Sequence, residues 1–192
     1  SSTTYVSEKL IKEVDERGTE REEHYDDDGQ LIKKERLLAR QNQLTCAAIS
    51  PDGQMVATGD KNFMVHIRRL KDGKLLHQLR GHTDEIKALA YTPDSQVLAS
   101  SGGEDETILF WRVADGRLLR TLQAKDPTIC LKFSPSGQYL ACGSSYRVHI
   151  WRIRSKKWMQ EIKKGCKSEE GISWSADETL LLCGYENNVH LL

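Results

Sequence analysis

The sequence has no long hydrophobic run, no secretory leader and no recognisable catalytic motif. None of its apolar stretches approaches the ~20 residues that cross a bilayer, and the opening Ser-Ser-Thr-Thr has neither a basic cap nor an apolar segment. We therefore expect neither a membrane-spanning protein nor an intact secretory precursor. Glycine-rich phosphate loops, histidine pairs at zinc-binding spacing and G-x-S-x-G motifs are also missing, so we expect no enzyme activity and no cofactor.

Cysteine is sparse, and its spacing excludes the usual structural roles. The five cysteines are odd in number and none lies in a C-x-x-C pair, so neither a disulfide framework nor a zinc clip is indicated. The acidic run at 26–28 suggests calcium, but an EF-hand loop beginning at Asp26 needs glycine where Leu31 stands and glutamate where Leu37 stands. We therefore expect no metal site, and reduced thiols in an intracellular protein, cytoplasmic rather than nuclear.

A net charge is also lacking, because 28 basic residues balance 28 acidic ones. The balance conceals two unlike parts. Residues 1–28 hold four basic and ten acidic residues, a charge of −6, which leaves +6 for residues 29–192. The zero total is therefore no evidence against a charged partner.

What the sequence does contain is a repeated turn. Proline stands second in Ser50-Pro51-Asp52-Gly53, Thr92-Pro93-Asp94-Ser95 and Ser134-Pro135-Ser136-Gly137, and a weaker fourth copy is Ser175-Ala176-Asp177-Glu178. The first residues of these turns are 42, 42 and 41 positions apart. Proline presets φ for a type I turn, and the small or polar residues behind it accept the bend. This constant interval indicates a repeat protein.

Each turn is flanked by short runs of alternating apolar residues, which predict β-strands. In the third repeat these runs are 129–133, 139–142, 148–152 and 158–162. The predicted unit is therefore four antiparallel strands, and the fold is all-β.

The second repeat carries a further set of residues: Gly81-His82, then Ser100, Asp105 and Trp111. With the turn and the period, these residues resemble the WD-repeat family of β-propellers, in which each repeat forms one four-stranded blade. The resemblance covers residues 43–192, as repeats at about 43–82, 83–125, 126–167 and 168–192. The sequence departs from the family pattern in having Gly-His once, Arg112 and Arg152 after the tryptophans, and Arg68 in the tryptophan position of the first repeat.

The resemblance implies that His82, Ser100 (or Ser101), Asp105 and Trp111 form a hydrogen-bonded tetrad inside one blade. We interpret this tetrad as structural rather than catalytic, because each buried polar group finds a partner in it. The other repeats lack the histidine of the Gly-His pair, so we expect mainly apolar packing to hold them together.

The number of repeats raises the question of how the ring is completed. Three full repeats and part of a fourth give an incomplete ring, whereas propellers close with four to eight blades. A longer parent chain, a second copy of this chain or a four-bladed ring would each complete it, and we favour the first. Residues 28–42 resemble the outer strand of a closing blade, and residues 1–27 are expected to be a charged acidic extension whose conformation the sequence leaves open.

The resemblance implies a non-catalytic scaffold that binds proteins within a larger complex through the loops at one end of the blades. Exposed tyrosine and arginine are frequent binding anchors, so Tyr146, Arg147 and Tyr185 are the strongest candidates. The full set of candidate partner-binding residues is Lys61, Asn62, Asp84, Glu104, Asp126, Tyr146, Arg147 and Tyr185.

The alternative is a subunit that binds RNA or DNA through the basic segment 152–167, in which lysines would meet phosphates and Trp158 would stack on a base. Against this, Trp158 aligns with leucines of the earlier repeats, and basic residues on an outer strand also prevent edge pairing. The candidate phosphate contacts are Arg152, Arg154, Lys156, Lys157, Lys163, Lys164 and Lys167.

Overall fold

The computed structural model describes the backbone of nine segments of the chain: 9–14, 20–25, 31–36, 43–145, 147–154, 157–162, 172–178, 181–185 and 188–190. Side chains are described for residues 43–145, 147–154 and 172–178. Every regular element in these segments is a β-strand, and none of them contains a helix able to cross a membrane. The chain divides into two units, residues 1–42 and residues 43–192.

The first unit contains three strands of equal length: β1 (Lys9–Val14), β2 (Glu20–Tyr25) and β3 (Leu31–Arg36). They form one antiparallel sheet in the order β1-β2-β3, and their first residues are eleven positions apart. Residues 31–36, within the segment expected to be the outer strand of a closing blade, form β3, which pairs with β2. Its role in closing a blade stays a prediction.

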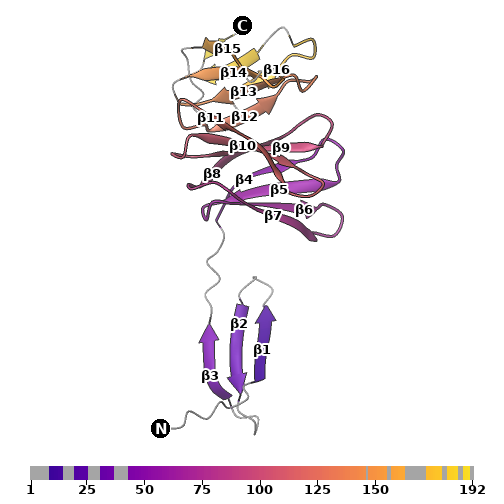
Figure 1. The fold of residues 1–192 in the computed structure, drawn as a ribbon, viewed down its shortest axis with the longest axis vertical. Coiled ribbons are helices and arrows are strands. Elements are labelled where there is room, and N and C mark those ends of the chain that lie inside the picture. The colour runs from indigo at the N-terminus through magenta and orange to yellow at the C-terminus, as the bar shows by residue number, and fades with distance from the viewer. Residues whose placement is uncertain are drawn as a thin grey trace. The chain divides into compact units, whose positions relative to one another are not determined.

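The second unit begins with two complete four-stranded sheets, blade 1 and blade 2 (Figure 1). The strands of blade 1 are β4 (Leu44–Ile49), β5 (Met55–Asp60), β6 (Met64–Arg69) and β7 (Leu75–Arg80). The strands of blade 2 are β8 (Ile86–Tyr91), β9 (Val97–Gly102), β10 (Thr107–Arg112) and β11 (Leu118–Gln123).

Blades 3 and 4 follow in chain order (Figure 1). Blade 3 contains β12 (Cys130–Phe133), β13 (Tyr139–Gly143), β14 (Val148–Arg152) and β15 (Lys157–Ile162). The described strands of blade 4 are β16 (Ile172–Trp174), β17 (Leu181–Tyr185) and β18 (Asn188–His190). All pairings are antiparallel between successive strands, which confirms the all-β fold with a four-stranded repeat; the described strands form an open series rather than a closed ring.

The repeated turns have the geometry that their residues predict. The backbone N–H of the fourth residue donates to the carbonyl of the first, at 2.8 Å from Gly53 to Ser50 and 2.8 Å from Gly137 to Ser134. The fourth residue has a positive φ each time, including +59° at Ser95. Glycine adopts this conformation without strain, which explains its presence in two of the turns.

Each blade packs one face against the opposite face of the next blade. On β10, Ile108 and Phe110 pack toward blade 3, where Phe110 meets Phe133 edge to face, with ring centroids 6.4 Å apart. Leu109 and Trp111 on the same strand pack toward blade 1. Alternate residues of a strand point to opposite faces, so one strand supplies two interfaces. Each large side chain buried in this way contributes about 1.5–3 kcal/mol of hydrophobic stabilisation.

Candidate functional site

The antiparallel order of each blade separates its connections into two ends. The links between blades and the loops between second and third strands share one end, which we call the loop rim, and the repeated turns lie at the other. The described residues of the loop rim are 61–63, 81–85, 103–106, 124–129, 144–145 and 147.

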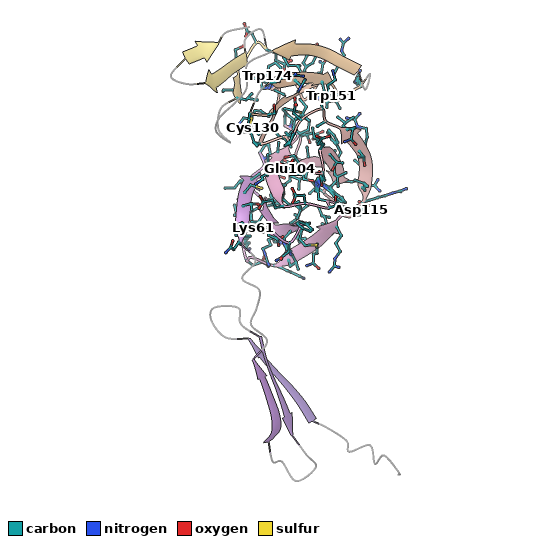
Figure 2. The ribbon with its side chains drawn as sticks, turned by 90° about the vertical axis from the view of Figure 1, so that its left-hand side faces the viewer. Lys61, Glu104, Asp115, Cys130, Trp151 and Trp174 are labelled. Carbon is teal, nitrogen blue, oxygen red and sulfur yellow. The ribbon has the colours of Figure 1, made fainter. Side chains whose placement is uncertain are left out.

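The partner-binding candidates within the described side chains all lie on the loop rim. Lys61 in blade 1 and Glu104 in blade 2 are exposed (Figure 2), and the others are partly exposed. Two of them organise the loops, because Asp84 accepts a hydrogen bond from the Glu104 backbone N–H at 2.6 Å and Asp126 contacts His149. The side chains of Tyr146 and Tyr185 lie outside the described residues, so their roles stay predictions.

Phe63 is a rim residue that the sequence did not single out. It is 40% exposed and has a φ of +67°, a conformation that a bulky side chain rarely adopts. Glu106, which directly precedes the third strand of blade 2 as Phe63 does in blade 1, has a φ of +51°, so this conformation recurs in the repeat. A sequence signal was present, since an apolar aromatic residue stands in a short loop where glycine or asparagine would be favoured.

The structure brings together His82, Ser100, Asp105 and Trp111 in blade 2. His82 Nδ1 lies 2.8 Å from Asp105 Oδ2, and His82 Nε2 lies 2.8 Å from Ser100 Oγ. The Trp111 indole N–H donates to the same Ser100 oxygen at 2.8 Å. A one-directional chain follows, in which Trp111 donates to Ser100, Ser100 to His82 and His82 to Asp105.

Backbone groups complete the environment of the Asp105 carboxylate. Asp105 accepts hydrogen bonds from the backbone N–H of Thr107 at 2.9 Å and of Thr83 at 3.1 Å. Gly102 makes room for it, because a Cβ at this position would collide with the carboxylate. The carboxylate thus links Thr83, just before the first strand of blade 2, to the loop between β9 and β10.

Burial and hydrogen bonding set the protonation of this pair. Burial lowers the pKa of His82 below its usual value, and this effect exceeds the opposing attraction of Asp105. Burial alone would raise the pKa of Asp105, but hydrogen bonds from Thr107 and His82 bring it below the usual value. At neutral pH the pair is therefore a neutral imidazole beside a carboxylate.

This arrangement contains the residue types of a catalytic triad, but it lacks access to a substrate. Ser100 has zero exposure and its oxygen is already engaged by Trp111 and His82. A nucleophile must reach the reacting atom, so the geometry supports a structural role for the tetrad.

Blades 1 and 3 contain their own histidine–carboxylate pairs, which add polar contacts to the apolar packing that is expected to be their main stabilisation. His66 Nδ1 lies 3.8 Å from Asp60 Oδ2 in blade 1, and His149 Nε2 lies 3.3 Å from Asp126 Oδ2 in blade 3. Both histidines are buried and occupy the same position of the third strand. The sequence feature that could have revealed these two histidine positions is the run Val-His-Ile, which occurs at 65–67 and again at 148–150.

The basic segment is described only in part. Arg152 and Arg154 are exposed, and the Arg152 guanidinium lies 6.0 Å from the centre of the Tyr139 ring. Lys157 belongs to β15, whose side chains are outside the described residues, as are Lys156, Lys163, Lys164 and Lys167. The nucleic-acid alternative thus stays a prediction. In the parts with described side chains, no group of three histidine, cysteine or acidic residues could hold a metal ion.

Comparison with known proteins places these blades in a family. The family model for the WD domain, G-beta repeat, matches residues 33–68, 73–112 and 116–152. The small ribosomal subunit protein RACK1y of Oryza sativa subsp. japonica is 33% identical over 151 residues, covering 74% of this chain and 45% of the relative. RACK1 of Neurospora crassa is 31% identical over 157 residues, covering 76% and 49%.

An uncharacterised WD repeat-containing protein of Synechocystis sp. is 38% identical over 104 residues, covering 54% of this chain and 30% of the relative. The chain spans about half the length of the curated RACK1 relatives it matches. The matched repeats, the antiparallel blades and the identity to these relatives agree with one another. The chain belongs to the WD-repeat family of β-propeller proteins.

Proposed function

We propose that this chain is a non-catalytic scaffold that binds proteins of a larger complex through the loop rim. The observation that carries the proposal is the exposed Phe63, two residues after Lys61 in the loop before β6. An exposed aromatic ring next to a cation is a typical anchor of a protein interface. The packed blades hold this loop in place and reduce the entropy that binding costs.

The relatives support assembly into a complex. Two of them are named as small ribosomal subunit proteins, which is the name of a component of a larger particle. For this chain we propose protein partners in a multi-subunit complex and a cytoplasmic location. The same relatives support a binding role rather than an enzymatic one, and the inaccessible Ser100 agrees with it.

A pull-down with the full chain tests the rim. We expect Phe63→Ala combined with Lys61→Glu to reduce capture of the main partners at least about tenfold, which corresponds to the loss of one interface hot spot. Lys74→Glu is the matched control, because Lys74 is exposed on the turn at the other end of the blade. Unchanged capture by the double variant, with its thermal unfolding unaltered, would show that the rim of blade 1 is not the binding surface.

A salt titration separates the nucleic-acid alternative from this proposal. Binding through phosphates weakens steeply as salt concentration rises, whereas an interface anchored by Phe63 weakens little. Binding of a labelled RNA at low salt that is lost in Arg152→Glu/Arg154→Glu would favour the alternative.

A further inference from the structure

The turn between the third and fourth strands of a blade, which we call the outer turn, begins directly after an arginine. This arginine is Arg69 in blade 1, Arg112 in blade 2 and Arg152 in blade 3, and each is the last residue of its third strand. All three are exposed. The recurrence of one cation at one position of the repeat allows the outer turns to be compared residue by residue.

In blades 1 and 2 the outer turn supplies a carboxylate to its arginine. Arg69 Nη1 donates to Asp72 Oδ2 at 3.0 Å. Arg112 donates to Asp115, which is labelled in Figure 2, through Nε at 2.9 Å and through Nη2 at 2.6 Å. Each carboxylate also accepts the backbone N–H two residues further along the chain, at 3.1 Å and 3.2 Å. The outer turn of a blade therefore has the geometry to hold a carboxylate.

Blade 3 has the arginine but not the carboxylate. Ser155 stands three residues after Arg152, at the position where blades 1 and 2 have their aspartate. A second arginine, Arg154, lies within the turn. Arg152 and Arg154 are both exposed, and neither forms an ion pair with any side chain that the structure describes. The outer turn of blade 3 thus has two cations and an open position for an anion.

A third arginine reaches this turn from the neighbouring blade. Arg120, on β11 of blade 2, donates from Nη1 to the carbonyl of Ile153 at 2.9 Å, and Ile153 lies between Arg152 and Arg154 in the chain. The Arg120 guanidinium is partly buried, 4.5 Å from the centre of the Phe110 ring, and burial lowers its pKa. No described carboxylate offsets this burial. A partly buried cation without an anion is unfavourable, so an anion from a partner would stabilise it.

Neither an incomplete ring nor protection of a sheet edge accounts for these arginines. Blades 2 and 3 each have a neighbouring blade on both sides, so the cluster is not exposed because a blade is missing. Basic residues protect an edge when they lie on an edge strand, whereas Arg152 ends the third strand and Arg154 lies in the turn. Like charges held close together repel one another, so folding alone does not favour this cluster.

We propose that the outer turn of blade 3, together with Arg120, binds an acidic segment of a partner protein. One carboxylate of the segment pairs with Arg152, as Asp72 and Asp115 pair with their arginines. Further carboxylates of the same segment pair with Arg154 and Arg120. Blades 1 and 2 favour a carboxylate over a phosphate, because aspartate fills the equivalent position in both. The outer turns lie at the end of the blades opposite the loop rim, so this proposal does not rest on the proposed function.

Titration of the full chain with labelled peptides tests the proposal. The probe is a fluorescein-labelled Glu-Ala-Glu-Ala-Glu-Ala-Glu peptide, and the matched peptide has glutamine in place of each glutamate. Binding is measured by fluorescence anisotropy at low salt. We expect the glutamate peptide to bind at least about tenfold more tightly, because several exposed ion pairs each strengthen binding a few-fold. Arg152→Gln combined with Arg154→Gln should remove most of this preference.

Arg112→Gln combined with Arg117→Gln is the matched control. It removes the same charge from the outer turn of blade 2, where Asp115 already engages Arg112. We expect it to weaken binding of the glutamate peptide less than about twofold. Asp115→Asn makes the opposite change, because it releases Arg112 and should strengthen binding. The substituted side chains are all exposed, so thermal unfolding should change little, and measuring it verifies the fold of each variant.

Four results would overturn the proposal. Equal losses in the two double variants would show that the peptide responds only to the overall charge of the protein. Equal affinity for the two peptides, or no binding of either, would exclude a site for carboxylates. Unchanged binding in Asp115→Asn would contradict the comparison between the blades. Tighter binding of a labelled oligouridylate of the same charge, lost in Arg152→Gln/Arg154→Gln, would show that these arginines bind nucleic-acid phosphates instead.

Discussion

Blades 1, 2 and 3 each bury a histidine beside a carboxylate, but the carboxylate comes from a different position in each blade. In blade 2 it is Asp105, in the loop after β9, and Gly102 at the end of β9 leaves space for it. In blade 1 the equivalent end position is occupied by Asp60 itself. In blade 3 the carboxylate is Asp126, in the link before the first strand.

The quality of the hydrogen bonding differs accordingly. Asp105 engages His82 at 2.8 Å and two backbone N–H groups, whereas the Asp60 oxygen that faces His66 is 3.8 Å away and has no hydrogen-bond partner among the described residues. A separation of 3.8 Å is too long for a hydrogen bond. The difference shows that the hydrogen bonding of a buried histidine–carboxylate pair in a repeat protein depends on its local backbone as much as on its residue types.

Asp105→Ala should produce the largest effect. It leaves the N–H groups of Thr83 and Thr107 and the His82 imidazole without their acceptor, so we expect a loss of about 3 kcal/mol in the free energy of unfolding. Denaturant unfolding measures it. The control is Asp115→Ala, because Asp115 pairs with Arg112 on an exposed turn and its removal should change stability little. A loss no larger than that of the control would contradict a stabilising role for the tetrad.

Acidification should produce the next largest effect. The pKa of His82 is lower in the folded protein than in the unfolded chain, so protons bind preferentially to the unfolded chain as pH falls through about 6.5. Burial also lowers the pKa of His66, so both histidines act in the same direction. The lowered pKa of Asp105 causes a further loss of folding stability only at more acidic pH, below about 4.

We therefore expect the free energy of unfolding to decrease between pH 7 and pH 5. The decrease should be smaller than the loss caused by Asp105→Ala. Chemical unfolding at several pH values tests this, with His82→Gln flattening the dependence more than His66→Gln. A pH-independent stability across this range would exclude neutral buried histidines in both blades.

His66→Leu should have the smallest effect. Leucine stands at the aligned position of blade 2 as Leu109 and would fill the same volume. The substitution has no hydrogen bond to Asp60 to lose, and gives up the contact of the imidazole Nε2 with the Gln78 side-chain amide at 3.1 Å. We expect a change within about 1 kcal/mol. The paired variant His82→Leu should cost more, because it removes the acceptor of Ser100 and the donor to Asp105. Equal losses in the two variants would show that the blade 1 and blade 2 pairs contribute alike.

Much of this architecture could be predicted from the sequence because it depends on local signals. The turn beginning at Ser50 and its copies gave the repeat length, and alternating apolar runs such as 148–152 gave the strands. Blade 2 could be predicted in detail because His82, Ser100, Asp105 and Trp111 follow the family pattern. The pairs in blades 1 and 3 were missed because they do not follow that pattern.

The N-terminal unit shows the limit of periodicity. Val6, Leu10 and Val14 fit a helix face as well as a strand, so the sequence left this segment open. The structure has β1 and β2 there, paired with each other, and β2 also pairs with β3. Whether such a segment forms a strand depends on hydrogen bonds to neighbouring strands. The residue pattern within one strand does not show these bonds.

By itself, the sequence determined that the chain is built of four-stranded repeats, because turn chemistry and strand alternation act over a few residues. Only the tertiary structure decided which groups meet across longer separations. His149 contacts Asp126, 23 positions away, and Phe110 of blade 2 meets Phe133 of blade 3. Such contacts depend on how blade faces pack, and packing is set by the shapes of many side chains at once.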